Sequence, residues 1–158
     1  MEHNTYSHKK KRKTLKKQLK GYKNKDGSQK ENSIERKVRL FLENEGLYYI
    51  REYGITYNKK YKSYDFCITD GLNYFFLIEA DGDFWHKTEG ELNKIQKKNK
   101  KNDLLKDKIA SEMGIPLIRL KESEIKYQME NVKQKIYEEI ERQKKAQSQP
   151  QLDLPLNE

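Results

Sequence analysis

Apolar residues recur at helical spacing in three parts of this chain. Between Asn32 and Gly46 they stand three and four positions apart, which predicts an amphipathic helix that ends at the glycine. The same spacing predicts a longer, more polar helix from about residue 89 to residue 113, ending at Gly114. A third amphipathic helix is predicted over residues 125–140. Each of these helices has an apolar face that must pack against something.

Four apolar or alternating runs predict strands. They cover residues 47–57, 62–69, 73–80 and 115–120. Asp70 and Gly71 are a hairpin signal between the second and third runs, so we expect those strands to pair antiparallel. The third strand, the long helix and the fourth strand form a right-handed βαβ unit, which adds a parallel strand. The order α-β-β-β-α-β-α therefore predicts an α/β fold with a central mixed sheet flanked by helices.

Charge divides the chain into an arm, a near-neutral domain and a tail. Residues 1–30 hold eleven Lys/Arg against two acidic residues, which equals the whole net charge of +9. We therefore place a basic, flexible arm at 1–31, a folded domain at 32–143 and a flexible tail at 144–158. Such an arm typically binds a polyanion such as DNA, with Lys10, Lys11 and Arg12 as candidate contacts. A solubilising segment and a localisation signal are the alternatives.

Composition argues against a membrane or secreted protein and against a scaffold built on cysteines. No apolar run approaches the length of a membrane-spanning helix, and the N-terminus lacks a secretory apolar segment. Cys67 is the only cysteine, so neither a disulfide framework nor a multi-cysteine zinc site can form. We therefore expect a cytoplasmic protein without a membrane partner.

Carboxylates concentrate at the end of the third strand. Glu79 and Asp81 are two positions apart, so their side chains point to one face of the sheet. The hairpin brings Asp65 of the neighbouring strand beside them. Carboxylates that converge at the end of a sheet favour a hard divalent cation, Mg²⁺ or Mn²⁺. Asp81 and Asp83 also flank Gly82 as turn residues would, but that alternative leaves the two strand acids unexplained.

Three further residues are candidates for proton transfer, each with an ordinary alternative. His86 follows the acidic turn, and imidazole titrates near neutrality, which suits a proton carrier beside a metal. A packed or surface histidine is the alternative. Glu35 has capping-box spacing from Asn32, and Asp103 resembles many solvated helix charges, so spacing alone selects neither of them.

The sequence resembles the very-short-patch repair endonucleases of the PD-(D/E)XK nuclease superfamily, and phage homing endonucleases that share their active-site set. The resemblance covers about Ser33 to Glu124 and rests on several motifs in the right order. They include the helix SIERKVRLFLENEG, the strand with YDF, the turn GDFWH, and the segment KNKKNDLLKDKIASEMGIPLIRL. The resemblance implies a restriction-endonuclease-like α-β-β-β-α-β core.

The resemblance also implies roles for the candidate residues. Asp65 corresponds to the main metal ligand, and the backbone carbonyl of Ala80 to a second ligand. His86 corresponds to the general acid or base. Glu35 and Asp103 correspond to residues that support this proton carrier. Together they imply metal-dependent hydrolysis of a phosphodiester bond.

Aromatic and basic residues are the implied DNA contacts. Phe84 and Trp85 correspond to aromatics that wedge between base pairs, with ordinary core packing as the alternative. Lysines at the start of the long helix would contact the phosphate backbone without reading its sequence. They are Lys94, Lys97, Lys98, Lys100 and Lys101.

Two departures separate this chain from the mismatch-repair members. Asp81 stands where they have a histidine, and with Glu79 it is a candidate for a further metal ligand. A single cysteine cannot build their Cys/His zinc site. We therefore expect nuclease chemistry to carry over better than recognition of T·G mismatches.

The end of the chain resembles the short peptide by which bacterial DNA-processing proteins bind the replicative sliding clamp. The match is QLDLPL, formed by Gln151, Leu152, Asp153, Leu154, Pro155 and Leu156. Alternating leucines suit an extended peptide that fills pockets in a groove, and the polar residues before them supply a linker. Chance leucines in an unstructured end are the alternative.

The sequence thus predicts a Mg²⁺- or Mn²⁺-dependent DNA endonuclease that a bacterial sliding clamp recruits. Two other functions stay open. One is a DNA-binding accessory factor that keeps the fold without catalysis. The other is a nuclease specific for branched DNA or for RNA.

Overall fold

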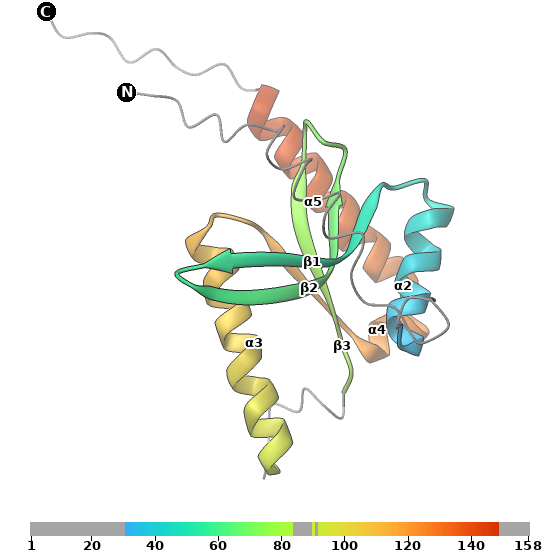
Figure 1. Cartoon of the computed structure of the whole chain (residues 1–158). Helices are drawn as coiled ribbons and strands as arrows, with labels where there is room; N and C mark the ends of the chain where they lie inside the picture. Colours follow the sequence, from blue (N-terminus) through green and yellow to red (C-terminus); the bar gives the residue numbers. More distant parts are fainter. Residues whose placement is uncertain (1–30, 84–89, 91, 149–158) are drawn as a thin grey trace, which may run out of the picture.

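The computed structural model describes residues 31–83, 90 and 92–148 of the chain. In these residues a four-stranded sheet has the strand order β1-β2-β3-β4, with helices on both of its faces (Figure 1). The strands are β1 (Tyr49–Tyr57), β2 (Lys60–Thr69), β3 (Phe75–Asp81) and β4 (Leu117–Lys121). The helices are α2 (Ser33–Asn44), α3 (Lys94–Glu112), α4 (Glu122–Tyr127) and α5 (Met129–Ser148).

The predicted mixed sheet is confirmed. β1 pairs antiparallel with β2, and β2 pairs antiparallel with β3. β4 pairs parallel with β3 after the crossover through α3. In the loop between β2 and β3, Oδ1 of Asp70 accepts the backbone N–H groups of Leu72 and Asn73, at 2.8 and 2.7 Å. This side-chain cap closes the turn that the Asp70-Gly71 signal predicted.

Local signals at the helix ends also agree with the prediction. Asn32 caps α2, and it forms a capping box with Glu35. Gly46 follows the C-cap of α2 with φ of 67°, and Gly114 follows the C-cap of α3 with φ of 64°. Both glycines adopt the left-handed conformation that commonly terminates a helix.

The helix predicted over residues 125–140 is wrong in one respect, because the structure divides it into α4 and α5. Gln128 leaves helical geometry, with φ of −137° and ψ of 48°. Ile125 and Val132 are seven positions apart on either side of the break, so the apolar spacing continues as if the helix were unbroken. α5 ends at Ser148, five residues beyond the predicted domain end at 143.

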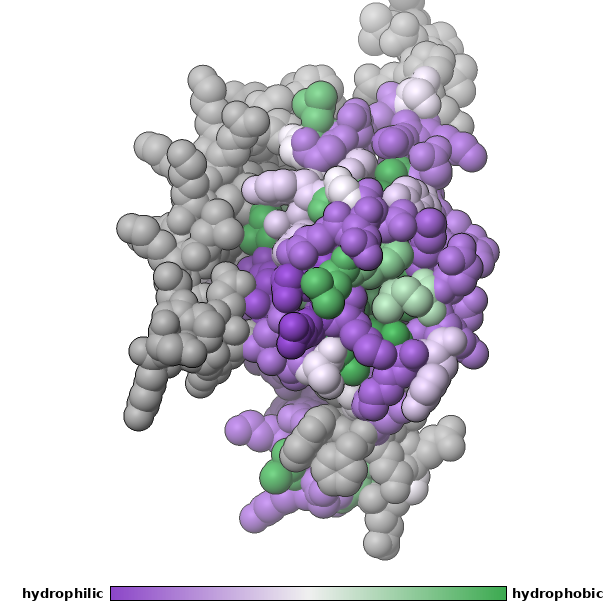
Figure 2. Space-filling model, turned by 90° about the vertical axis from the view of Figure 1, so that its right-hand side faces the viewer, coloured by the Kyte–Doolittle hydropathy of each residue, from purple (hydrophilic) through white to green (hydrophobic). Residues whose placement is uncertain are grey.

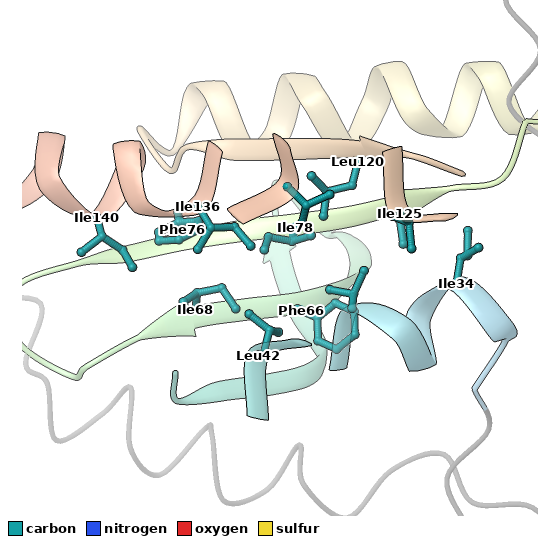
Figure 3. Packing of buried hydrophobic residues seen from close by; sticks show 13 residues of the cluster. Ile34, Leu42, Phe66, Ile68, Phe76, Ile78, Leu120, Ile125, Ile136 and Ile140 are labelled. Carbon is teal, nitrogen blue, oxygen red and sulfur yellow. The ribbon is translucent and has the colours of Figure 1, made fainter. Parts of the chain in front are cut away.

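Each face of the sheet has its own apolar core. On one face, α2, α4 and α5 pack against side chains from the three strands β2, β3 and β4 (Figure 3). Leu42 of α2 lies over Phe66 and Ile68 of β2 there. On the other face, Ile109 and Ala110 of α3 join a second cluster of buried residues. The sheet is thus the middle layer of an α/β/α arrangement.

The outer surface of α2 and α4 is mostly polar. The face seen over α2 and α4 is hydrophilic across most of its area, with hydrophobic residues scattered between (Figure 2). Among the described helices, none combines the length and apolar character needed to cross a membrane.

Leu42→Ala tests the packing of α2 on the sheet. Leu42 is fully buried, so its truncation should lower the free energy of unfolding by about 2–5 kcal/mol. Urea denaturation measures this change. Leu40→Ala is the control, because Leu40 lies on the same helix with 45% of its surface exposed and should cost much less. Equal losses in the two variants would contradict the observed orientation of α2.

Candidate active site

β2 and β3 stop pairing at Asp65 and Glu79. Their register runs from the pair Thr69 and Phe75 to the pair Phe66 and Ile78. Beyond that point each acid bonds to the backbone of the opposite strand. The N–H of Asp65 donates to Oε1 of Glu79 at 3.1 Å, and the N–H of Ala80 donates to Oδ2 of Asp65 at 2.8 Å. Two carboxylates therefore take the place of ladder hydrogen bonds between diverging strands.

β1 is irregular at the same level of the sheet. Its register with β2 passes from the pair of Arg51 and Phe66 to the pair of Tyr53 and Tyr64, omitting Glu52 opposite Asp65. Glu52 has φ of 49°, an unfavourable conformation for a residue with a long side chain. Its Oε2 accepts the hydroxyl of Ser63 at 2.9 Å. Such backbone outliers concentrate at functional sites.

A cavity of about 430 Å³ lies where the strands diverge. Five acidic residues line it: Glu35, Asp65, Glu79, Asp103 and Glu122. Ala80 and Gly82 of the following segment also line it. The structure therefore brings together four of the predicted acids and Ala80, from α2, β2, β3 and α3.

Glu35 reaches the cavity from the first turn of α2. Its carboxylate closes the capping box by accepting the N–H of Asn32 at 3.4 Å. Nη2 of Arg51 on β1 approaches Oε2 of Glu35 to 3.4 Å. Capping and a place in the cavity lining are therefore compatible, because the Glu35 side chain has both.

Lys106 is a cavity residue that the sequence reasoning missed. Its Nζ lies 2.7 Å from Oε2 of Glu79, and the side chain is largely buried. The hydroxyl of Tyr64 donates to the backbone carbonyl of Lys106 at 2.8 Å, which ties this turn of α3 to β2. Asn99, Asp103 and Lys106 recur at helical spacing and all line the cavity. The stripe is visible in the sequence, but it lies among many similar charges and so does not single out Lys106.

The structure does not bring Asp81 into the cavity lining. Nη1 of Arg119 on β4 bonds both carboxylate oxygens of Asp81, at 2.9 and 3.0 Å. The same arginine bonds Asp107 at 2.9 Å and the carbonyl of Asp103 at 3.3 Å. Asp81 and Glu79 do share the α3 face of the sheet, as alternation predicts. Arg119 draws the Asp81 carboxylate towards β4 and α3.

Burial and mutual repulsion raise the pKa values of Glu35, Asp65 and Glu79. Burial raises the pKa of Glu35 to about 7, and the negative charge of Asp65 adds to the effect. Burial and the charge of Asp65 likewise raise the pKa of Glu79 to about 7, against the opposing pull of Lys106. The pKa of Asp65 is also raised, chiefly by burial. The negative charge of these acids is therefore costly in the cavity, chiefly because they are buried.

The donor set suits a hard cation more than a soft one. Carboxylate oxygens are the ligands that Mg²⁺ and Mn²⁺ prefer. Asp65 uses Oδ2 for the N–H of Ala80, and Glu79 uses its two oxygens for Asp65 and Lys106. Within the described ranges, no three His, Cys, Asp or Glu side chains are grouped as a complete ligand set. A cation would therefore compete with these hydrogen bonds.

The predicted α3 lysines lie on the first half of the helix and are exposed. They are Lys94, Lys97, Lys98, Lys100 and Lys101. The other predicted contacts fall outside the described residues. These are Phe84, Trp85 and His86, the arm residues Lys10, Lys11 and Arg12, and the tail peptide at 151–156.

A family profile described as Protein of unknown function (DUF2726) matches residues 26–140. The chain belongs to this family. No curated protein and no solved structure matches the chain. The family match spans the sheet, the cavity and most of α5, so it covers every described residue of the candidate site.

Glu35→Gln should reveal the raised pKa as a stability effect. The folded state holds the Glu35 proton up to about pH 7, whereas the unfolded state releases it near 4.5. Ionisation of Glu35 therefore lowers the stability of the wild type as pH rises through that window. The variant should become more stable relative to the wild type across the same range, and its glutamine still suits the capping box.

Urea denaturation at several pH values measures the difference between the two proteins. Glu141→Gln, on the exposed surface of α5, is the matched control for the loss of one carboxylate. A pH-independent difference between Glu35→Gln and the wild type would contradict the buried, repelled carboxylate.

Proposed function

We propose that this protein is a metal-dependent endonuclease that hydrolyses phosphodiester bonds in DNA. The supporting observation is the cavity in which Glu35, Asp65 and Glu79 meet from three different elements, with Lys106 against one of them. Titratable groups with raised pKa values in a cavity are typical of a catalytic site. The resemblance to very-short-patch repair endonucleases supplies the reaction type.

Asp65 and Glu79 are the proposed ligands of Mg²⁺ or Mn²⁺, with the carbonyl of Ala80 as a third. When bound, such a cation polarises a phosphoryl oxygen and makes water a better nucleophile. The fit is chemical, because hard oxygen donors whose pKa values are raised by burial and by mutual repulsion gain most from a positive charge. Asp81 is a weaker candidate because Arg119 holds both of its oxygens.

The other cavity residues have proposed roles in proton transfer and charge. Glu35, with a pKa of about 7, can accept a proton at neutral pH, either from water or from His86. Asp103 lies on the same wall as Lys106 and would orient the imidazole. The ammonium of Lys106 would stabilise negative charge on the phosphate as the bond breaks.

DNA and a sliding clamp are the proposed partners, in the cytoplasm. The exposed lysines of α3 would hold the phosphate backbone near the cavity. From the sequence alone, Phe84 and Trp85 would wedge into the duplex, and Lys10, Lys11 and Arg12 would add contacts. The peptide at 151–156 would tether the enzyme to a clamp and raise its local concentration on DNA.

Asp65→Asn should abolish cleavage while the protein stays folded. Loss of a metal ligand removes several kcal/mol of transition-state stabilisation, so plasmid cleavage in Mg²⁺ should fall by about 10³-fold. Glu141→Gln, which removes an equal charge from the surface of α5, should leave the rate unchanged. EDTA should stop cleavage by the wild type.

The substrates should include linear, mismatched and branched DNA, and RNA. An absence of cleavage on all of them would favour the accessory factor over the enzyme. A wild-type rate in Asp65→Asn would contradict the assigned site. Preference for branched DNA or for RNA would identify the structure-specific nuclease instead.

Deletion of residues 150–158 tests the clamp peptide separately. The truncated chain should lose binding to an immobilised bacterial sliding clamp, because QLDLPL supplies the leucines that would fill its groove. Cleavage of free DNA should be unaffected. A full-length chain with Leu154→Ala and Leu156→Ala should also lose clamp binding, which separates the role of the leucines from the length of the tail. Unchanged clamp binding in both variants would contradict the motif.

A further inference from the structure

The β1–β2 hairpin lies against α3 at the rim of the acidic cavity. Nζ of Lys62 on β2 donates to Oδ1 of Asn102 on α3, and the hydroxyl of Tyr64 bonds the carbonyl of Lys106. Asn102 and Lys106 both line the cavity. The closed end of the hairpin extends past α3 in Figure 1. The turns of α3 that line the cavity therefore also contact the hairpin.

The tip of this hairpin exposes lysines and an aromatic ring. Asn58 and Lys59 have φ of 47° and 62°, the pair of positive values typical of a tight two-residue turn. Lys59, Lys60 and Tyr61 are exposed, Tyr61 by 60%. A Cβ atom on residue 54 would lie only 2.4 Å from the hydroxyl oxygen of Tyr61. Gly54 has no such atom, so the tyrosine ring can approach β1.

Positive charge is segregated on the hairpin and on the facing helix. No acidic residue occurs in residues 53–64 or in residues 93–102. Among the described residues, neither Lys59 nor Lys60 forms an ion pair, and nor do the five lysines that begin α3. Several other lysines pair with acids, as Lys135 does with Glu124 at 2.5 Å and Lys133 with Glu45 at 3.2 Å. Their charge is largely cancelled, whereas the hairpin and α3 lysines sum to a local positive potential.

We propose that the hairpin tip and the first half of α3 form one basic surface that holds the phosphate backbone of DNA beside the acidic cavity. This inference rests on the proposed function and adds a second DNA-binding element, Lys59, Lys60 and Lys62, to the helix. The cavity acids repel phosphates, so a strand needs compensating cations next to the site. A strand that left the cavity over Asn102 would meet Lys62, whose Nζ bonds Asn102, before the lysines of the tip.

Salt-dependent DNA binding by the full chain tests the hairpin. The parent carries Asp65→Asn, so that binding is measured without cleavage, on a labelled DNA duplex over a range of KCl concentrations. The hairpin variant adds Lys59→Asn and Lys60→Gln, with asparagine chosen because it tolerates positive φ. The control variant adds Lys144→Gln and Lys145→Gln, an adjacent exposed pair near the end of α5. Both variants lose two charges, and thermal unfolding checks that both stay folded.

The hairpin variant should bind more weakly, and the slope of log affinity against log salt should shrink by about 0.9 for each phosphate that the lysines no longer neutralise. The control should keep the parent slope. Equal slopes in parent and hairpin variant, or equal changes in both variants, would overturn the proposal. So would tighter binding of an RNA duplex of the same sequence. If the hairpin variant binds DNA more weakly but the chain with Asp65 intact cleaves no substrate, the nuclease proposal is refuted and the basic surface stands.

Discussion

The whole candidate site depends on one exchange of hydrogen bonds between β2 and β3. Where the ladder should continue, the carboxylates of Asp65 and Glu79 accept backbone N–H groups from the opposite strand. The strands can diverge there without leaving those donors unsatisfied. The divergence opens the cavity, and the acids that allow it are the acids the cavity presents. Structure and proposed chemistry therefore use the same two side chains, and burial raises the pKa of both.

α3 links the acidic cavity to a run of exposed lysines. Its last turns pack Ile109 and Ala110 into the core, while its first turns, which carry the exposed lysines, extend beyond the sheet (Figure 1). Arg119 fixes the junction by bonding the carbonyl of Asp103 and the carboxylate of Asp107. Because Lys106 lies between those two residues, this anchor also sets its ammonium against Glu79.

Most of the fold and part of the site could be predicted from the sequence, for identifiable reasons. Periodicity and helix-end signals predict the sheet order, and the hairpin predicts that Asp65 lies beside Glu79. Lys106 could not be selected, because a lysine in KKNDLLKDK differs from its neighbours only after α3 is docked at a particular rotation.

Asp81 shows the converse. Alternation places its side chain on the correct face of the sheet, but its oxygens bond Arg119 of β4, the strand that pairs parallel with β3. The break at Gln128 preserves the apolar spacing and so leaves no signal of that kind.

The cost of the buried acids bears on the choice between an enzyme and an inactive DNA-binding factor. Acids whose pKa values are raised by burial and repulsion make the folded state less stable at neutral pH, and they repel the phosphates that a binding protein must attract. Neutral residues such as glutamine could accept the same backbone N–H groups without that penalty. A protein that only binds DNA gains nothing from three carboxylates beside its basic surface. A hydrolase would gain a cation site and a proton acceptor from the same carboxylates, which supports the proposal of catalysis.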